Sequence, residues 1–145
     1  FTTTAVAAVV YALGGDATWY RIAFWTSVAG VVTGAVAALP GFVDWAFGIP
    51  DKSPAKRVGF VHMVLNLVVV GIFTLSAVIQ SARMDEFAPS PALTVFLSLV
   101  GVSLLLVSGY LGWSLVQTHH VGVDLGAEQV RPERIEPSRQ VPSAP

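Results

Sequence analysis

The chain has 145 residues, of which 54% are hydrophobic and only 12% are charged, against about 25% charged residues in ordinary soluble domains. Its net charge of -1 gives no reason to expect nucleic acid as a partner. The absence of cysteine excludes disulfides, thiolate metal sites and cysteine-ligated iron–sulfur clusters within this chain. The composition therefore favours a membrane protein of one domain.

The first apolar run ends at Leu13, where Gly14-Gly15-Asp16 predicts the end of a helix and a turn. About 13 helical residues span only about 20 Å, less than the roughly 30 Å of a bilayer's hydrocarbon core. No basic segment of a signal peptide precedes this run. We therefore expect the sequence to enter its first helix partway along.

The second predicted helix covers about Trp19 to Leu39, an apolar stretch with aromatic residues near its start. Pro40-Gly41 is expected to disturb or end it, because proline lacks the N–H group that a helix interior needs. A short amphipathic piece, Phe42 to Phe47, then leads into a polar loop at residues 48–58.

Two further runs, Gly59 to Ile79 and Leu93 to Val116, contain no charged residue and are long enough to cross a bilayer. They predict a third helix over Gly59 to Ile79 and a fourth over Ala92 to Gln117. The sequence thus predicts an all-α integral membrane four-helix bundle over residues 1–120. Residues 121–145 are rich in proline and are expected to form an extended extramembrane tail.

Basic residues near the helix ends predict the orientation of the bundle. With four helices, the central loop and the C-terminus share one side of the membrane. That side holds Lys52, Lys56, Arg57, Arg131, Arg134 and Arg139, whereas the other side holds Arg21 and Arg83. This distribution places the central loop and the tail in the cytoplasm of a bacterium, with the bundle in its inner membrane.

Small residues predict where helices pack, because close approach rather than hydrophobicity joins helices in lipid. The candidates lie on the second and fourth helices: Gly30, Gly34, Ala38, Gly101, Ser108 and Gly112. We expect these two helices to approach each other along the small residues, or to use them for an outside partner.

Polar residues from three segments are expected to gather near the cytoplasmic face. They are Asp44, His62, Asn66, His119 and His120. One interpretation is structural, with the Asp44 carboxylate accepting a hydrogen bond from His62 or Trp45. A second is haem or bacteriochlorophyll ligation through His62, with His119 as a second ligand. A third is proton handling or metal binding, although the arrangement offers few metal ligands.

Several short motifs occur in a fixed order along the chain. P-G-x-x-D-W occupies residues 40–45, H-x-x-x-N occupies residues 62–66, and residues 108–123 read SGYLGWSLVQTHHVGV. In this order the chain resembles a bacterial four-helix membrane family catalogued as a domain of unknown function, over nearly all of residues 1–123. Members are sometimes fused to Rieske-type iron–sulfur domains, which implies a setting near electron transfer.

The chain departs from the family pattern at several positions. The usual His-Pro near the start of the first helix is not present in this sequence. Trp113 replaces the second glycine of a pair, Gln117 stands at a tyrosine position, and His120 follows the family histidine, His119, in place of glycine. Trp113 puts in doubt any close approach that the second glycine provides.

The sequence shows no phosphate-binding loop, GxSxG elbow or HExxH motif. We therefore predict a non-catalytic accessory subunit of a larger photosynthetic or respiratory membrane complex, with no cofactor of its own. Its partners would be the lipid bilayer and other membrane subunits, with the 121–145 tail lying on a partner surface. The alternative is a b-type haem electron-transfer protein that uses His62 and His119.

Overall fold

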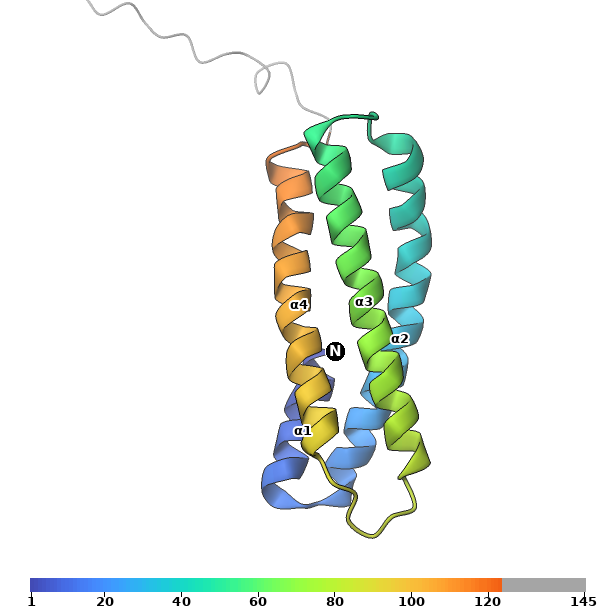
Figure 1. Cartoon of the computed structure of the whole chain (residues 1–145), viewed down its shortest axis with the longest axis vertical. Coiled ribbons are helices and arrows are strands. Elements are labelled where there is room, and N and C mark those ends of the chain that lie inside the picture. Colours follow the sequence, from blue (N-terminus) through green and yellow to red (C-terminus); the bar gives the residue numbers. More distant parts are fainter. Residues whose placement is uncertain (124–145) are drawn as a thin grey trace, which may run out of the picture.

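The computed structural model describes residues 1–123, which form four α-helices and one short π-helix. The elements in chain order are α1 (Thr2–Gly14), α2 (Ala17–Val43), η1 (Asp44–Gly48), α3 (Pro54–Ala82) and α4 (Ala92–Gln117). Consecutive helices run antiparallel in one bundle (Figure 1). The predicted all-α class and the four helices are confirmed, whereas the tail predicted from sequence lies, from residue 124 on, outside the described residues.

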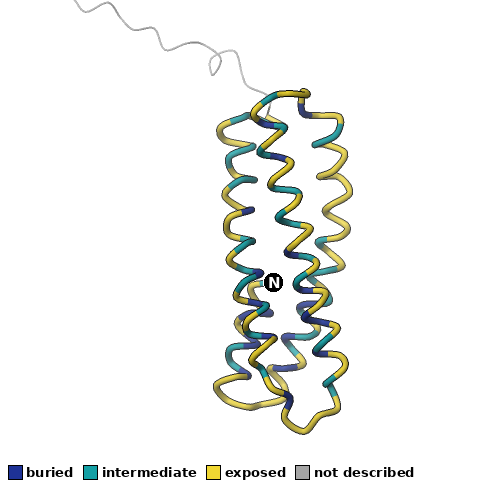
Figure 2. Tube along the Cα trace, in the orientation of Figure 1, coloured by how far each residue is buried: buried dark blue, intermediate teal, exposed yellow. Residues whose placement is uncertain are grey.

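The two ends of the bundle differ in charge. We call the end with Lys52, Lys56 and Arg57 the basic end, and the end with the 83–91 loop the opposite end. α1 lies only beside the half of the bundle next to the opposite end, so the N-terminus is halfway along the bundle (Figure 1). Figure 2 shows that most buried positions lie in that same half.

Each helix packs on two neighbours. α1 and α3 both contact α2 and α4, whereas α2 and α4 are diagonal within the described part of the chain and do not pack on each other. The predicted approach of the second and fourth helices is therefore not found. A ladder of small residues indicates close packing, but the pattern does not say which neighbour supplies the contact.

Local signals in the sequence explain several helix ends. Gly15 ends α1 in the left-handed conformation (φ 72°), where its N–H donates to the carbonyl of Tyr11 at 2.8 Å. The Asp16 carboxylate caps α2 by accepting from the Thr18 N–H at 2.8 Å. This hydrogen bond lowers the pKa of the exposed Asp16 carboxyl.

The predicted end of the second helix at Leu39 is wrong. α2 continues through Pro40 to Val43 and then changes into the five-residue π-helix η1. Proline removes one backbone donor, but leaving the helix would expose many more unpaired backbone groups to an apolar medium. A local π-helical turn is a known way for a helix to adjust around such a defect.

The predicted start of the third helix at Gly59 is also wrong, because α3 begins at Pro54. Ser53 is the cap, and its hydroxyl accepts from the Lys56 N–H at 3.1 Å. A serine followed by proline is a typical helix start, since proline at the first position loses no hydrogen bond. The charged residues Lys56 and Arg57 therefore lie on the first turns of α3 and not in a loop.

Aromatic packing fills the centre of the bundle. Phe73 of α3 is fully buried and stacks on Phe1, with ring centroids 4.1 Å apart. Gly101 of α4 lies against the Phe73 ring, and Gly30 of α2 lies against the Phe1 ring. Gly34 lies against Val70 of α3. These glycines thus provide room for large side chains of neighbouring segments.

Tyrosine hydroxyls connect the helices at the opposite end. Tyr11 of α1 donates to the carbonyl of Pro89 at 2.8 Å, and Tyr20 of α2 donates to the carbonyl of Gln80 at 3.2 Å. The two rings meet edge to face at 5.1 Å. These hydrogen bonds join the α1–α2 hairpin to α3 and to the 83–91 loop.

An exposed ion pair closes the 83–91 loop. Arg83 donates from Nε and Nη2 to the Glu86 carboxylate at 2.9 to 3.1 Å. These hydrogen bonds lower the pKa of Glu86 below its usual range. The contribution of this pair to stability is therefore present above the ordinary pKa of glutamate and is lost as the pH falls through the lowered value.

We predict that Gly101→Ala destabilises the bundle. A Cβ at Gly101 would lie 2.5 Å from Cε2 of Phe73, and the stacked Phe1 ring restricts the movement of Phe73. The overpacking is expected to cost about 1–3 kcal/mol, more than the roughly 1 kcal/mol that alanine gains over glycine in a helix. Thermal unfolding in detergent micelles measures the difference.

Gly109→Ala is the matched control, because Gly109 is on the same helix and a Cβ added there would meet nothing within 4 Å. This variant is expected to be at least as stable as the unmodified chain. If Gly101→Ala unfolded at the same temperature as Gly109→Ala or higher, the packing role of Gly101 would be refuted.

Candidate functional site

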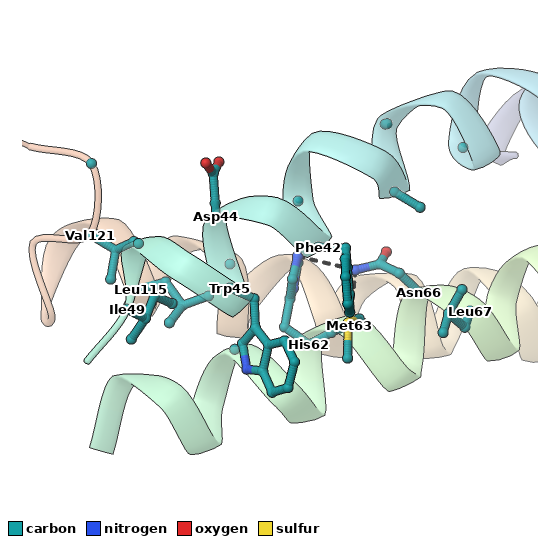
Figure 3. A pocket seen from close by; sticks show the side chains of 18 of the residues that line it. Phe42, Asp44, Trp45, Ile49, His62, Met63, Asn66, Leu67, Leu115 and Val121 are labelled. Carbon is teal, nitrogen blue, oxygen red and sulfur yellow. Dashed lines mark hydrogen bonds between the residues drawn. The ribbon is translucent and has the colours of Figure 1, made fainter. Parts of the chain in front are cut away.

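A polar bridge joins α3 to α4 in the half of the bundle next to the basic end. His62 Nδ1 lies 2.8 Å from the carbonyl oxygen of Ser108. The Asn66 Nδ2 group lies 3.1 Å from His62 Nε2 and 2.8 Å from Ser108 Oγ. Figure 3 shows His62 and Asn66 side by side on α3, one turn apart. We call these three residues the polar bridge.

The short contact to Ser108 fixes the proton on the His62 ring. A carbonyl oxygen only accepts, so Nδ1 must carry the proton that is donated to Ser108. In the neutral ring, Nε2 is then an acceptor, and the Asn66 amide supplies the hydrogen. Both ring nitrogens of His62 therefore have partners inside the bundle, as polar groups in a membrane helix require.

Gly112 allows the bridge to form. It lies one turn after Ser108 on α4, and a Cβ there would lie 2.9 Å from Cε1 of His62. The imidazole ring therefore packs directly on the backbone of α4. Because Ser108 and Gly112 are one turn apart, the carbonyl that accepts from His62 and the space that receives the imidazole ring lie on the same face of α4.

A second polar group lies at the basic end, around Lys56. Its Nζ donates to the carbonyls of Trp45, Ala46 and Ile49 at 2.5, 3.1 and 3.1 Å. The ammonium group also lies 3.4 Å from Asp51 and 4.7 Å from the centre of the Trp45 ring. Lys56 thus satisfies carbonyl oxygens that are left unpaired where η1 ends.

The role of Lys56 was not predicted from the sequence. Trp45 Nε1 donates to the Lys56 carbonyl at 3.0 Å, so the two residues are joined in both directions. The only signal in the sequence is a cation shortly after a helix end, which is typical of carbonyl capping. That signal does not specify which of Lys52, Lys56 and Arg57 provides the cap.

The predicted cluster of five polar residues is brought together only in part. Asp44 is exposed, and within residues 1–123 no hydrogen bond to its carboxylate is found; His62 and Trp45 donate to other groups. His119 and His120 lie beside Gly48 to Ala55, where they line a separate cavity of about 370 Å³. His62 and Asn66 are the two members that contact each other.

A larger cavity separates α2 from α4. Its volume is about 670 Å³, and α3 forms its floor with His62 and Asn66. Ala38 of α2 and Leu115 of α4 both line it. Asp44 lies at its edge (Figure 3). We call this cavity the α2–α4 groove. It lies between α2 and α4, which do not pack on each other within residues 1–123.

The fold and the site define an integral membrane protein built as a helical bundle. Three helices of the described chain are long and apolar enough to cross a membrane: Ala17–Gly48 (α2 with η1), Pro54–Ala82 and Ala92–Gln117. The chain belongs to the DUF2231 family of predicted membrane proteins, whose profile matches residues 1–125. This confirms the family resemblance seen in the motifs, whereas the fusion to Rieske domains stays an expectation. No curated protein and no solved structure matches the chain.

We predict that Asn66→Leu weakens the bundle by about 1–3 kcal/mol, because the half-buried His62 Nε2 would be left without its donor. Unfolding of the purified protein in a mixed detergent titration measures this cost. Met63→Leu is the control, since Met63 also lines the α2–α4 groove but is not part of the polar bridge.

A double-mutant cycle separates the bridge from simple packing. In the Asn66→Leu background, His62→Leu should cost clearly less than it does alone, since its main partner on α3 is already absent. Additive effects of the two substitutions would show that His62 and Asn66 are not coupled.

Proposed function

We propose that this chain is a non-catalytic accessory subunit of a larger membrane complex in photosynthetic or respiratory bacterial membranes. The family establishes a predicted membrane protein, and the more specific role is our inference. A non-catalytic role is supported by the polar bridge, because the hydrogen bonds of His62 and Asn66 hold α3 to α4. Such hydrogen bonds between helices are a common means of stabilising membrane bundles.

The observation that carries the proposal is the outward position of Gly71 in the middle of α3. Gly71 is exposed, and a Cβ added there would meet nothing within 4 Å, unlike one at Gly101 or Gly112, which face side chains of α3. On a helical wheel Gly71 lies opposite the buried residues Val69 and Phe73. A glycine there costs about 1 kcal/mol of helix propensity without helping the bundle to pack.

A helix of another subunit would make use of this position. Small residues on an outward face let a second transmembrane helix approach closely, which is how helices associate in lipid. We therefore propose that the outward face of α3 around Gly71 contacts the partner. The further proposal that the tail lies on the partner concerns residues 124–145, beyond the described part of the chain.

The proposed orientation rests on the basic residues. Lys52, Lys56 and Arg57 lie at the basic end, whereas Arg83 lies at the opposite end. The bias of lysine and arginine toward the cytoplasm supports an inner-membrane protein whose basic end and C-terminus face the cell interior.

The haem or bacteriochlorophyll alternative stays a prediction that the geometry does not favour. An axial ligand needs a free imidazole nitrogen, and both nitrogens of His62 have partners on α3 and α4. His119, the second proposed ligand, lines the other cavity at the basic end. Ligation through these two residues would therefore require the polar bridge to open.

The partner face is tested with Gly71→Leu. Because the first atom of the added side chain meets nothing within the bundle and leucine favours a helix more than glycine does, the purified variant should unfold at the same temperature as the unmodified chain or higher. In gently solubilised native membranes it should nevertheless lose the large complex and migrate as a small species. Size-exclusion chromatography with immunodetection measures this shift.

Val78→Leu is the matched control, since Val78 is also an outward residue of α3, 59% exposed, and does not offer a gap. It should leave the complex intact. If the unmodified 15.3 kDa chain migrated alone in its micelle, the accessory-subunit proposal would be refuted. If the unmodified chain formed a large complex and Gly71→Leu left that complex intact, the partner would contact another face of the bundle.

A further inference from the structure

Two buried polar atoms on α3 and α4 have no hydrogen-bond partner among residues 1–123. They are Gln80 Oε1 of α3 and Ser98 Oγ of α4, and both side chains are fully buried. Inside a membrane bundle, neither lipid nor bulk water supplies the missing partner. A buried polar atom without a partner is costly and rare, so we expect each of these two atoms to be satisfied by something inside the bundle.

The packing of α3 on α4 brings the two atoms to one level of the bundle. The helices run antiparallel (Figure 1), and Gly101 of α4 lies against the ring of Phe73. Three residues onward on α3 and three residues back on α4, this register places Ser76 opposite Ser98. Gln80 Nε2 donates to the Oγ and the carbonyl of Ser76 at 3.2 and 3.3 Å. The Gln80 amide therefore lies beside Ser76, across the helix interface from Ser98.

The two unpartnered atoms have complementary chemistry. Gln80 Oε1 only accepts hydrogen bonds, whereas the Ser98 hydroxyl donates one hydrogen and also accepts. A direct hydrogen bond would satisfy both atoms, but neither atom has the other as a partner. One small molecule that accepts from Ser98 and donates to Gln80 would satisfy both.

The surroundings restrict the size and charge of this molecule. The core cluster next to it consists of Ala7, Ala8 and Ala23, and Val95 of α4 packs against these alanines, one turn before Ser98. A charged molecule would need a partner of opposite charge in this apolar core. Water is small and neutral, and buried waters typically join polar groups that otherwise lack partners.

We propose that one internal water molecule joins α3 to α4 between Gln80 and Ser98. The water accepts the hydroxyl hydrogen of Ser98 and donates one of its own hydrogens to Gln80 Oε1. The Ser76 hydroxyl, which contacts the Gln80 amide, is available as a third partner. The site lies away from the outward face around Gly71, so either proposal can fail without the other.

A crystal structure of the full chain that resolves ordered water tests the proposal directly. Density for one water is expected within hydrogen-bond distance of both Gln80 Oε1 and Ser98 Oγ. A structure in which Ser98 donates directly to Gln80, or in which no water lies between the two, would overturn the proposal.

Unfolding of variants in detergent micelles provides an independent test, because the sign of the effect depends on the water. Removing a hydroxyl that has no partner should stabilise the bundle or leave it unchanged, whereas removing a hydroxyl that binds a water should destabilise it. We therefore expect Ser98→Ala to lower the unfolding temperature by about 2–4 °C. Ser103→Ala is the matched control, since Ser103 is an exposed serine of the same helix whose hydroxyl donates to the Leu99 carbonyl at 2.9 Å.

A double-mutant cycle connects the hydroxyl with the amide. Gln80→Met replaces the amide by an apolar chain of similar length, and should lower the unfolding temperature less in the Ser98→Ala background than alone. Two results of these unfolding experiments would overturn the proposal. One is an unfolding temperature of Ser98→Ala that equals or exceeds that of Ser103→Ala, and the other is additivity of Ser98→Ala and Gln80→Met.

Discussion

Inside the apolar layer of a membrane, a polar group can be satisfied only inside the protein, and this constraint organises the whole bundle. The fully buried polar side chains, such as Thr4, Ser27 and Ser76, lie between helices. Ser27, for example, donates to the carbonyl of Phe73 at 3.0 Å, which joins α2 to α3. Where soluble bundles depend on hydrophobic burial, this bundle combines close packing with hydrogen bonds that have no competing water.

The same constraint explains the irregular end of α2. Pro40 removes a backbone donor, the chain changes into η1, and carbonyls at the end of η1 face no helical partner. Lys56 reaches these carbonyls from the first turn of α3, and its ammonium group also contacts the Trp45 ring. One cation near the membrane boundary thus stabilises a helix end that could not remain unpaired further inside.

The sequence predicted the elements well where a single physical signal acts. The charge-free run before Gln117 predicted α4 with the bounds that are observed, because length and hydropathy alone specify a spanning helix. Pro40 led to the wrong prediction of a helix end. The rule that proline ends a helix comes from soluble proteins, where the backbone groups released from the helix form hydrogen bonds with water. Ser53 followed by Pro54 is a typical helix start. The charges of Lys56 and Arg57 nevertheless led to the prediction of a loop at these residues.

Tertiary partners were harder to predict than helices. His62 and Asn66 could be placed on one helix face, but their acceptor, the Ser108 carbonyl, is a backbone atom that every residue possesses. A pattern of side chains cannot reveal such a partner. Likewise, the small residues of α2 and α4 indicated close contacts, yet the contacts are made by Phe1, His62 and Phe73.

The polar bridge also fixes the orientation of the Asn66 amide. Nδ2 and Oδ1 of Asn66 belong to one planar amide, so the orientation that serves His62 necessarily turns the oxygen toward the groove. If the amide were reversed, His62 Nε2 would face an oxygen without a proton between them. The contact between His62 Nδ1 and Ser108 opposes that reversal, because it keeps the ring proton on Nδ1. The hydrogen bonds that hold α3 to α4 therefore support one another, because both the Ser108 contact and the Asn66 contact require the same tautomer of His62.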